Sequence, residues 1–241
     1  MSALLSAELL KLRTTRTFVA LVGVALALSL LVVVLTTVLS DDLTADDVRE
    51  IFTFDFTALF ILLLGVIGMA GEWRHRTITS TVLAAPDRLR LLGAKVLAYA
   101  VAGVVLSLVV TVAIMAVGTV ILAARGEATA GVADLIDVLW RNLVVAALLG
   151  AFGVCIGAIV RNQIVATIGL LVFAFAIEPA VLGLASDVGR FGPTVGAPNG
   201  IVGADGFEDL LAPGLALLVM VAWIGLGFAA AAWLLRRRDL V

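Results

Sequence analysis

The chain has 241 residues, of which 63% are hydrophobic, with a mean hydropathy of +1.20 and a formal net charge of −2. Since soluble domains are only about half apolar, this composition excludes a soluble globular protein and indicates an integral membrane protein. The single cysteine, Cys155, excludes an internal disulfide, and the single histidine, His75, excludes a metal site built from several histidines.

Apolar runs along the chain predict an all-α membrane protein. Because a helix rises 1.5 Å per residue, about 20 apolar residues cross the hydrocarbon core of a bilayer. The third run is longer than a bilayer requires, so we expect it to tilt or protrude. We predict one transmembrane domain over residues 1–241, with six spans at about 18–39, 54–70, 91–123, 139–160, 164–177 and 210–235.

The segment before the first span has the pattern of an amphipathic helix. One helical stripe carries Leu5, Leu9 and Leu12. The charged residues Glu8, Lys11 and Arg16 lie largely off this stripe. We therefore expect an interfacial helix on the inner leaflet, with its apolar face against membrane lipid.

A polar stretch at 71–95, reading GEWRHRTITSTVLAAPDRLRLLGAK, separates the second and third spans. A loop of roughly 20 residues is longer than neighbouring helices need, and such loops are often functional. The pattern favours a short helix over 73–83, with Ile78 and Val82 on or near one face, which ends before Pro86.

This loop has two interpretations. A short helix held by two spans would move both spans when a partner pushes on it. Alternatively, the loop is a solvated basic segment that only sets the orientation of the chain. In either case Asp87 can N-cap the helix that continues into the third span.

The fourth span carries small residues on one helical face, at Ala146, Gly150, Gly153 and Gly157. Such a face lets two helices approach closely in lipid, where van der Waals packing drives association. The partner can be another helix of this chain or a second copy, and the pattern does not decide between them.

Near the end of the fifth span, Glu178 and Pro179 interrupt the apolar run. A carboxylate inside a membrane is costly and suggests a transport pathway or a paired site. The alternative is an ordinary residue at the outer end, reached by water because Pro179 breaks the helix. A Gly/Pro-rich segment then leads to residue 209.

Basic residues are distributed unevenly between the two sides of the membrane. Twelve of the sixteen lie on the side of both termini, and the other four are Arg49, Arg125, Arg141 and Arg190. Because Lys and Arg accumulate in cytoplasmic segments, we expect both termini in the cytoplasm and the protein in the cytoplasmic (inner) membrane.

The loop and the N-terminal segment together resemble a known family. The N-terminal segment reads AELLKLRTTR, and the loop carries, in order, Glu72, Thr77, Ile78, Pro86, Arg88 and Lys95. With six spans and both ends inside, this pattern is similar to that of type-2 ATP-binding-cassette transporter permeases. In that family a Glu ends the second span and a Lys lies at the mouth of the third.

The resemblance implies an export channel made of two copies, or of one copy and a paralogous permease. It also implies that the first cytoplasmic loop docks on a separate ATPase, and that the segment before the last span dips back into the outer leaflet. The residues expected to couple to the ATPase are Glu72, Arg74, Arg76, Ile78, Val82, Arg88 and Lys95.

Aromatic residues of the second and fifth spans are candidates for a substrate path. The resemblance places the translocation route near these two spans, so Phe56, Phe60 and Phe173 are candidate lining residues together with Glu178. The alternative is that these aromatic rings face lipid or anchor the helices at the membrane surface.

The chain lacks a phosphate-binding loop of the GxxxxGK[ST] type. It has two lysines; Lys11 is followed by Leu12 and Lys95 by Val96, and glycine precedes neither. We therefore expect no cofactor, metal or catalytic residue in this chain, with ATP and Mg²⁺ bound by the partner ATPase. We expect no nucleic-acid partner.

These observations favour a permease subunit of an exporter for a hydrophobic or amphipathic small molecule, such as a drug, an antibiotic or a lipid. The alternatives are an ion-coupled secondary transporter and an intramembrane enzyme. The first would need ionisable groups in mid-membrane or paired broken helices, and the second a cluster of polar catalytic residues within the spans.

Overall fold

No strand occurs in the part of the chain that the computed structural model describes, which is residues 2–75, 77, 87–204 and 209–237. Within this part, six helical segments are long and apolar enough to cross a membrane. They are Arg16–Leu39, Ala45–Arg74, Arg88–Arg125, Val132–Ile159, Gln163–Leu184 and Pro213–Arg237. The predicted all-α membrane protein with six spans is thereby confirmed.

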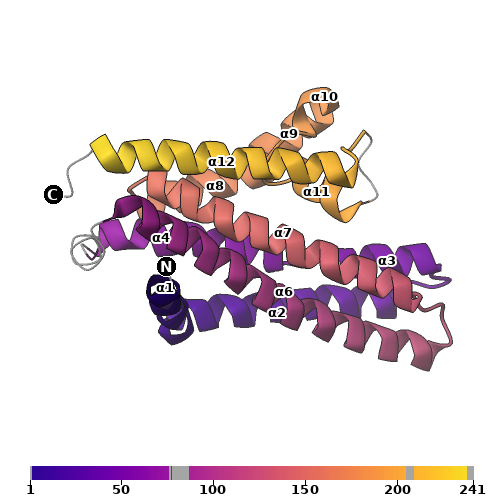
Figure 1. Cartoon of the computed structure of the whole chain (residues 1–241). Coiled ribbons are helices and arrows are strands. Elements are labelled where there is room, and N and C mark those ends of the chain that lie inside the picture. The colour runs from indigo at the N-terminus through magenta and orange to yellow at the C-terminus, as the bar shows by residue number, and fades with distance from the viewer. Residues whose placement is uncertain (1, 76, 78–86, 205–208, 238–241) are drawn as a thin grey trace.

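Helix α1 and the last turn of α12 lie at the same end of an elongated bundle (Figure 1). The helices in chain order are α1 (Ser2–Thr14), α2 (Arg16–Leu39), α3 (Ala45–Thr53), α4 (Thr57–Arg74), α6 (Arg88–Arg125), α7 (Val132–Ile159), α8 (Gln163–Val172), the π-helical turn η1 (Phe173–Ile177), α9 (Glu178–Leu184), α10 (Ser186–Gly189), α11 (Gly196–Val202) and α12 (Pro213–Arg237).

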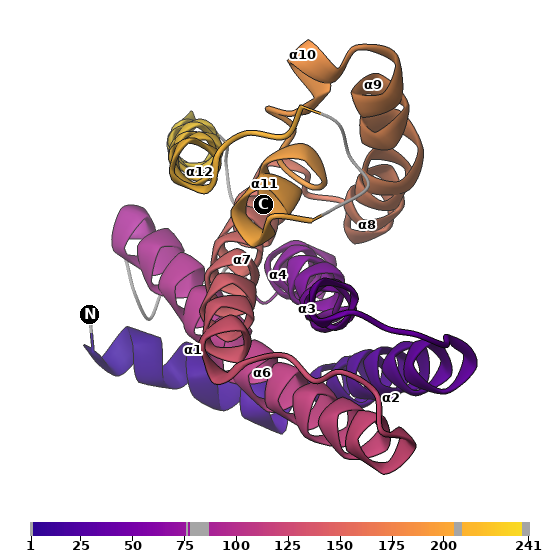
Figure 2. The ribbon, with the colours of Figure 1, turned by 90° about the vertical axis from the view of Figure 1, so that its right-hand side faces the viewer.

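Helices α4 and α7 form the centre of the bundle. Viewed along its length, α1, α2 and α6 lie on one side of them, and α8 to α12 lie on the other (Figure 2). Of the six candidate spans, α7 is the most deeply buried, whereas α2, the span from α8 to α9, and α12 expose most of their surface. The exposed side chains are largely apolar, which suits a lipid environment or a partner subunit.

The small residues of α7 bring it into direct contact with the backbones of α4 and α6. A Cβ atom added at Gly153 would lie 2.3 Å from the carbonyl oxygen of Leu62, and one at Gly157 would lie 2.7 Å from that of Val66. A Cβ added at Gly150 would lie 2.5 Å from the carbonyl oxygen of a residue on α6. The structure therefore places this glycine face against helices of the same chain.

Helix α6 begins and ends with well-defined caps. The Asp87 carboxylate accepts hydrogen bonds from the backbone N–H groups of Leu89 and Arg90, both at 3.1 Å, which confirms the predicted N-cap. Gly126 ends the helix in the left-handed conformation, with φ of 74°. Its 38 residues exceed the predicted 91–123 and span roughly 57 Å at 1.5 Å per residue.

The fifth helical segment differs from the predicted end at residue 177. Instead of breaking at Pro179, it continues through the π-helical turn η1 into α9 and ends at Leu184. The N–H of Glu178 donates to the carbonyl of Phe173, five residues earlier. Proline removes one helical hydrogen bond, and a wider turn absorbs that loss while the helix axis continues.

The chain turns back into the bundle between α9 and α12. Helix α11 packs against α7 and α12, and its residues Ala197, Ile201 and Val202 are buried. Gly203 then ends α11 in the left-handed conformation, with φ of 69°. A re-entrant position of this segment in the outer leaflet stays a prediction.

Candidate functional site

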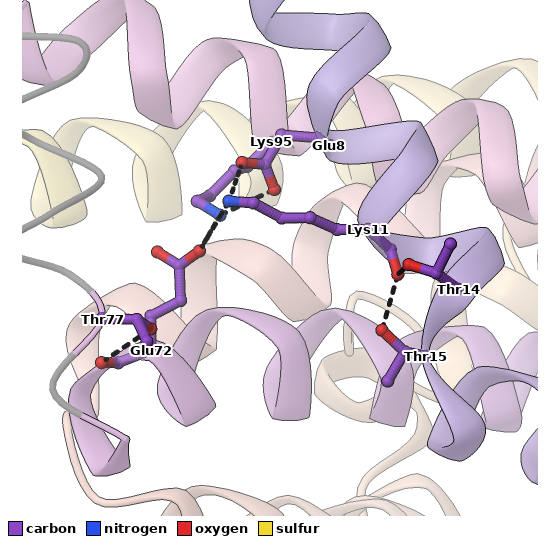
Figure 3. Close-up of polar contacts among 7 residues, drawn as sticks. All are labelled: Glu8, Lys11, Thr14, Thr15, Glu72, Thr77 and Lys95. Atoms are coloured by element: carbon purple, nitrogen blue, oxygen red, sulfur yellow. Dashed lines mark hydrogen bonds and ion pairs between the residues drawn. The ribbon is translucent and has the colours of Figure 1, made fainter.

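Four charged side chains from three helices form a closed ring, the charge ring, made of Glu8, Lys11, Glu72 and Lys95 (Figure 3). Lys95 Nζ lies 2.8 Å from Glu8 Oε2 and 2.7 Å from Glu72 Oε1. Lys11 Nζ lies 2.7 Å from Glu8 Oε1 and 3.3 Å from Glu72 Oε1. Each carboxylate therefore lies between two ammonium groups, and the ring has no net charge.

Half of the charge ring comes from one helix, α1, and the other half from the facing ends of α4 and α6. Glu8 and Lys11 are three residues apart on α1 and so share one face of that helix. Glu72 lies in the last turn of α4, and Lys95 lies about two turns into α6. The ring thus joins α1 to both helices that flank residues 75–87.

Burial makes this pairing necessary. The side chain of Lys95 is 2% exposed and that of Glu8 is 6% exposed, whereas that of Lys11 is half exposed. Removing a charge from water is costly unless an opposite charge and hydrogen bonds compensate for it. The ring meets this condition for Lys95 with two carboxylate partners.

The pKa values of the two α1 residues reflect the same balance. Burial disfavours the charged form of Glu8, but the attraction of Lys95 and hydrogen bonds from Lys11 and Lys95 outweigh it and hold the pKa of Glu8 below its usual value. Burial also acts against the charge on Lys11, but its contacts with Glu8 and Glu72 prevail and raise the pKa of Lys11. Both groups are ionised at neutral pH.

A cavity of about 580 Å³ lies beside the charge ring and is lined by residues of α1, α4 and α6, including all four ring members. Glu72 Oε2 is buried there without a hydrogen-bond partner among the described residues, as is the Oε1 atom of Gln163, another lining residue. Two buried acceptors without protein partners therefore face the same cavity, where a bound water or a ligand donor could satisfy them.

The other predicted coupling residues lie outside the charge ring. Arg74 is exposed at the end of α4. Arg16, which was predicted for the interfacial helix and not for coupling, is exposed at the start of α2. The Arg88 guanidinium donates a hydrogen bond to the Leu235 carbonyl at the end of α12. Residues Arg76, Ile78 and Val82, and with them the predicted short helix, lie outside the described residues.

A second cavity, the Asp55 cavity, has a volume of about 210 Å³ and lies between the α3–α4 junction, α7, η1 and the start of α11. Phe56 lines it, together with the carboxylate-bearing Asp55. Phe60 and Phe173 are not among its lining residues, since Phe60 is buried in the helix core and Phe173 is half-buried elsewhere on η1. Of the predicted path residues, the structure brings only Phe56 to this cavity.

Sequence reasoning missed Asp55. The sequence contained a signal for it, since this carboxylate lies between two aromatic residues at the start of a long apolar run. Ionisable groups within membrane spans are commonly functional. Asp55 is the second residue of the predicted span 54–70, where a carboxylate resembles an ordinary residue at the membrane surface.

Glu178 is buried, with 3% of its surface exposed, and is paired with backbone amides. Its carboxylate accepts hydrogen bonds from the N–H groups of Val195 at 2.7 Å and of Thr194 and Gly196, both at 2.9 Å, and from the Thr194 hydroxyl. These bonds hold the segment before α11 against α9. Thr194 and Val195 also line the Asp55 cavity, so Glu178 positions its wall without lining it.

Comparison with protein families identifies a match over much of the chain. A family model described as "ABC-2 family transporter protein" matches residues 4–177, which is more than half of the chain. This range includes the charge ring and Asp55 and ends immediately before Glu178. No curated protein matches the chain.

Proposed function

Because the chain belongs to the ABC-2 family of transporter proteins, we propose that it is the membrane subunit of an ATP-binding-cassette exporter for a hydrophobic or amphipathic small molecule. A drug, an antibiotic or a lipid fits this class. ATP and Mg²⁺ bind to a separate cytoplasmic ATPase. The membrane subunit lies in the cytoplasmic membrane with both termini inside.

The observation that carries this proposal is the charge ring at the ends of α4 and α6. The loop expected to receive the ATPase joins these two helices, and the ring clamps both of them to α1. A push on the loop therefore moves α1, α4 and α6 together, because a buried ring cannot open without leaving charges unpaired.

The exposed apolar surfaces of α2, α8 and α12 suit a second copy of the chain or a paralogous permease, together with lipid. Two subunits would enclose a route between them. Each ATPase closure would then rock the helices that carry the charge ring and expel the substrate outward. No step of this cycle requires a catalytic group in the membrane subunit.

The experiment is a mild-detergent purification of the tagged chain from its native membrane, with mass spectrometry of the proteins that accompany it. We expect a cassette ATPase at near-stoichiometric amounts. The complex is then reconstituted into liposomes, and transport is measured with ATP or with a proton gradient alone. Repeated recovery of the chain without an ATPase, or transport driven by the proton gradient alone, would contradict the proposal.

The ring is tested in the same complex with Glu72→Gln, which keeps the side-chain shape and removes one charge. We expect the ATPase to remain bound while ATP-driven transport falls by roughly 2- to 30-fold, the usual range for a residue that carries coupling. The matched control is Arg90→Gln, because Arg90 is near the same loop but its side chain is 72% exposed. If Glu72→Gln and Arg90→Gln transport at equal rates, the charge ring does not couple the ATPase to transport.

A further inference from the structure

The Asp55 carboxylate lies where α3 ends and α4 begins, within a segment apolar enough to cross a membrane. Asp55 Oδ2 accepts a hydrogen bond from the Thr111 hydroxyl of α6 at 2.9 Å, and Oδ1 accepts one from the Thr57 N–H at 3.0 Å. Both donors are neutral. Asp55 is half-buried, so the group is partly withdrawn from solvent but still reaches the cavity.

No basic side chain forms an ion pair with Asp55 in the described part of the chain. The two arginines on the neighbouring helices, Arg49 on α3 and Arg141 on α7, both pair with Asp137, at 3.0 Å and 2.9 Å. The remaining polar groups on the cavity wall are neutral, as at Asn142 and Asn199. Among the described residues that line it, the cavity therefore has one acidic group and no matching cation.

The rest of the cavity wall is largely apolar and aromatic. It includes Phe54, Phe56, Leu149 and Phe175, and Phe54 and Phe56 pack edge to face with ring centroids 5.5 Å apart. Aromatic faces attract cations as well as apolar groups. The wall thus suits a ligand that is apolar apart from one positive charge.

The cavity size limits which part of a ligand it can hold. Its volume of about 210 Å³ is below the roughly 300 Å³ at which pockets for whole drug-sized molecules begin. Phe54 and Phe175 on its wall are 58% and 65% exposed, so the cavity opens toward the apolar surface of the bundle. A ligand can place its head group at Asp55 and leave its tail at that surface.

We propose that the Asp55 cavity recognises the cationic head of an amphipathic substrate, such as an alkyl or arylalkyl ammonium group. This assignment rests on the proposed function, because it specifies the substrate class that the exporter carries. Asp55 supplies the charge that selects an amine over a neutral analogue of the same shape. The aromatic wall binds the adjoining apolar portion.

The test measures binding of 4-phenylbutylamine and of 4-phenylbutanol, its neutral counterpart, to the full chain in lipid nanodiscs by calorimetry, with empty nanodiscs as reference. We expect the chain to prefer the amine. Asp55→Asn should weaken amine binding on the order of 30-fold or more, as expected for loss of one partner of a desolvated charge pair, and should leave alcohol binding unchanged.

Two further variants separate charge from structure. Asp46→Asn removes an exposed acid from the same helix–turn region and should change neither affinity. Thr111→Val removes the hydroxyl that Asp55 binds but keeps the carboxylate, so amine selectivity should persist. Loss of selectivity in Thr111→Val but not in Asp55→Asn, or equal weakening of both ligands by Asp55→Asn in a chain that still unfolds cooperatively, overturns the assignment.

The readout is independent of the ATPase. Amine selectivity that depends on Asp55 supports the site even when no ATPase accompanies the chain, which is the outcome that contradicts the exporter proposal. Conversely, an ATP-driven complex whose chain binds amine and alcohol equally refutes the site and leaves the exporter proposal in place.

Discussion

At the scale of single residues, Lys95 and Asp55 show two ways in which the bundle accommodates a charge. Lys95 is almost completely buried and is neutralised by two carboxylates within 2.8 Å. Asp55 accepts hydrogen bonds from the neutral Thr57 N–H and Thr111 hydroxyl, without a cationic partner among the described residues, and faces a cavity. The first arrangement stabilises helix packing, and the second leaves an attraction that a ligand can satisfy.

The pH dependence of stability follows from the charge ring. A lowered pKa of Glu8 means that its contribution is present above the unfolded value of about 4.5 and is lost as the pH falls through the lower folded value. A raised pKa of Lys11 means that its contribution is present below about 10.5 and is lost as the pH rises through the higher folded value.

We therefore expect the thermal midpoint of the purified chain to be highest between these limits and to fall in acid below about pH 4.5. In Glu8→Gln the midpoint at neutral pH should be lower and the acid-induced loss smaller. The control is Glu50→Gln, since Glu50 is exposed on α3. Identical acid profiles for the native chain and Glu8→Gln would show that the ring does not stabilise the fold. The measurement is thermal unfolding in detergent at a series of pH values.

At the scale of helices, glycines and one π-helical turn decide how the elements meet. Glycines of α7 allow backbone contact with α4 and α6, and such contact is the main source of association between helices in lipid. The turn η1 lets the fifth segment pass Pro179 and brings Glu178 to the backbone amides of Val195 and Gly196 at the start of α11. The α7 glycines and the η1 turn therefore both bring helices of this chain into close contact.

Gly153→Ala tests the contact between α7 and α4. The added Cβ would lie 2.3 Å from the Leu62 carbonyl oxygen, so the helices must separate, and we expect a loss of about 1–3 kcal/mol in stability. Gly169→Ala on α8 is the matched control, because its Cβ would meet nothing within 4 Å and alanine favours helices. Thermal unfolding of both variants is the measurement. A stable Gly153→Ala chain would mean that α7 does not pack as described.

At the scale of the whole molecule, the sorting of charge and the exposure of apolar surface define how the bundle sits in a membrane. Most of the apolar surface on α2, α8 and α12 faces outward, and the charge ring lies at the end that holds α1 and the end of α12. This arrangement places the charge ring near one end of the apolar bundle, where a charged network can lie close to a membrane surface.

Cysteine labelling tests the orientation. Cys155 is buried, and replacing it with alanine gives a background into which Arg13→Cys or Asp46→Cys, both at exposed positions, is introduced. With a membrane-impermeant maleimide on intact cells, we expect Asp46→Cys to be labelled and Arg13→Cys to react only after permeabilisation, because basic residues accumulate inside. The reverse pattern would invert the proposed topology.

Much of the fold could be predicted from the sequence, because crossing a bilayer is a local property of about 20 consecutive apolar residues. The helical class, the six spans and the Asp87 cap depend on residues close together in the chain, and the structure agrees with them. The family resemblance also depended on short local patterns, and the family match confirms it. The fifth segment extends beyond its predicted end because the π-helical turn compensates for Pro179. The helix preferences of single residues do not predict such a turn.

The partners of the charged residues were decided only by the tertiary structure. Lys95 meets Glu8 across 87 positions of sequence, and Asp55 meets Thr111 across 56. Which helices become neighbours depends on close contacts such as those of Gly150 and Gly153, summed over the whole bundle. Local sequence was therefore enough to predict six helices that are long and apolar enough to cross a membrane. Packing decided which charges form a ring and which one faces a cavity, because these contacts form only when helices distant in sequence pack together.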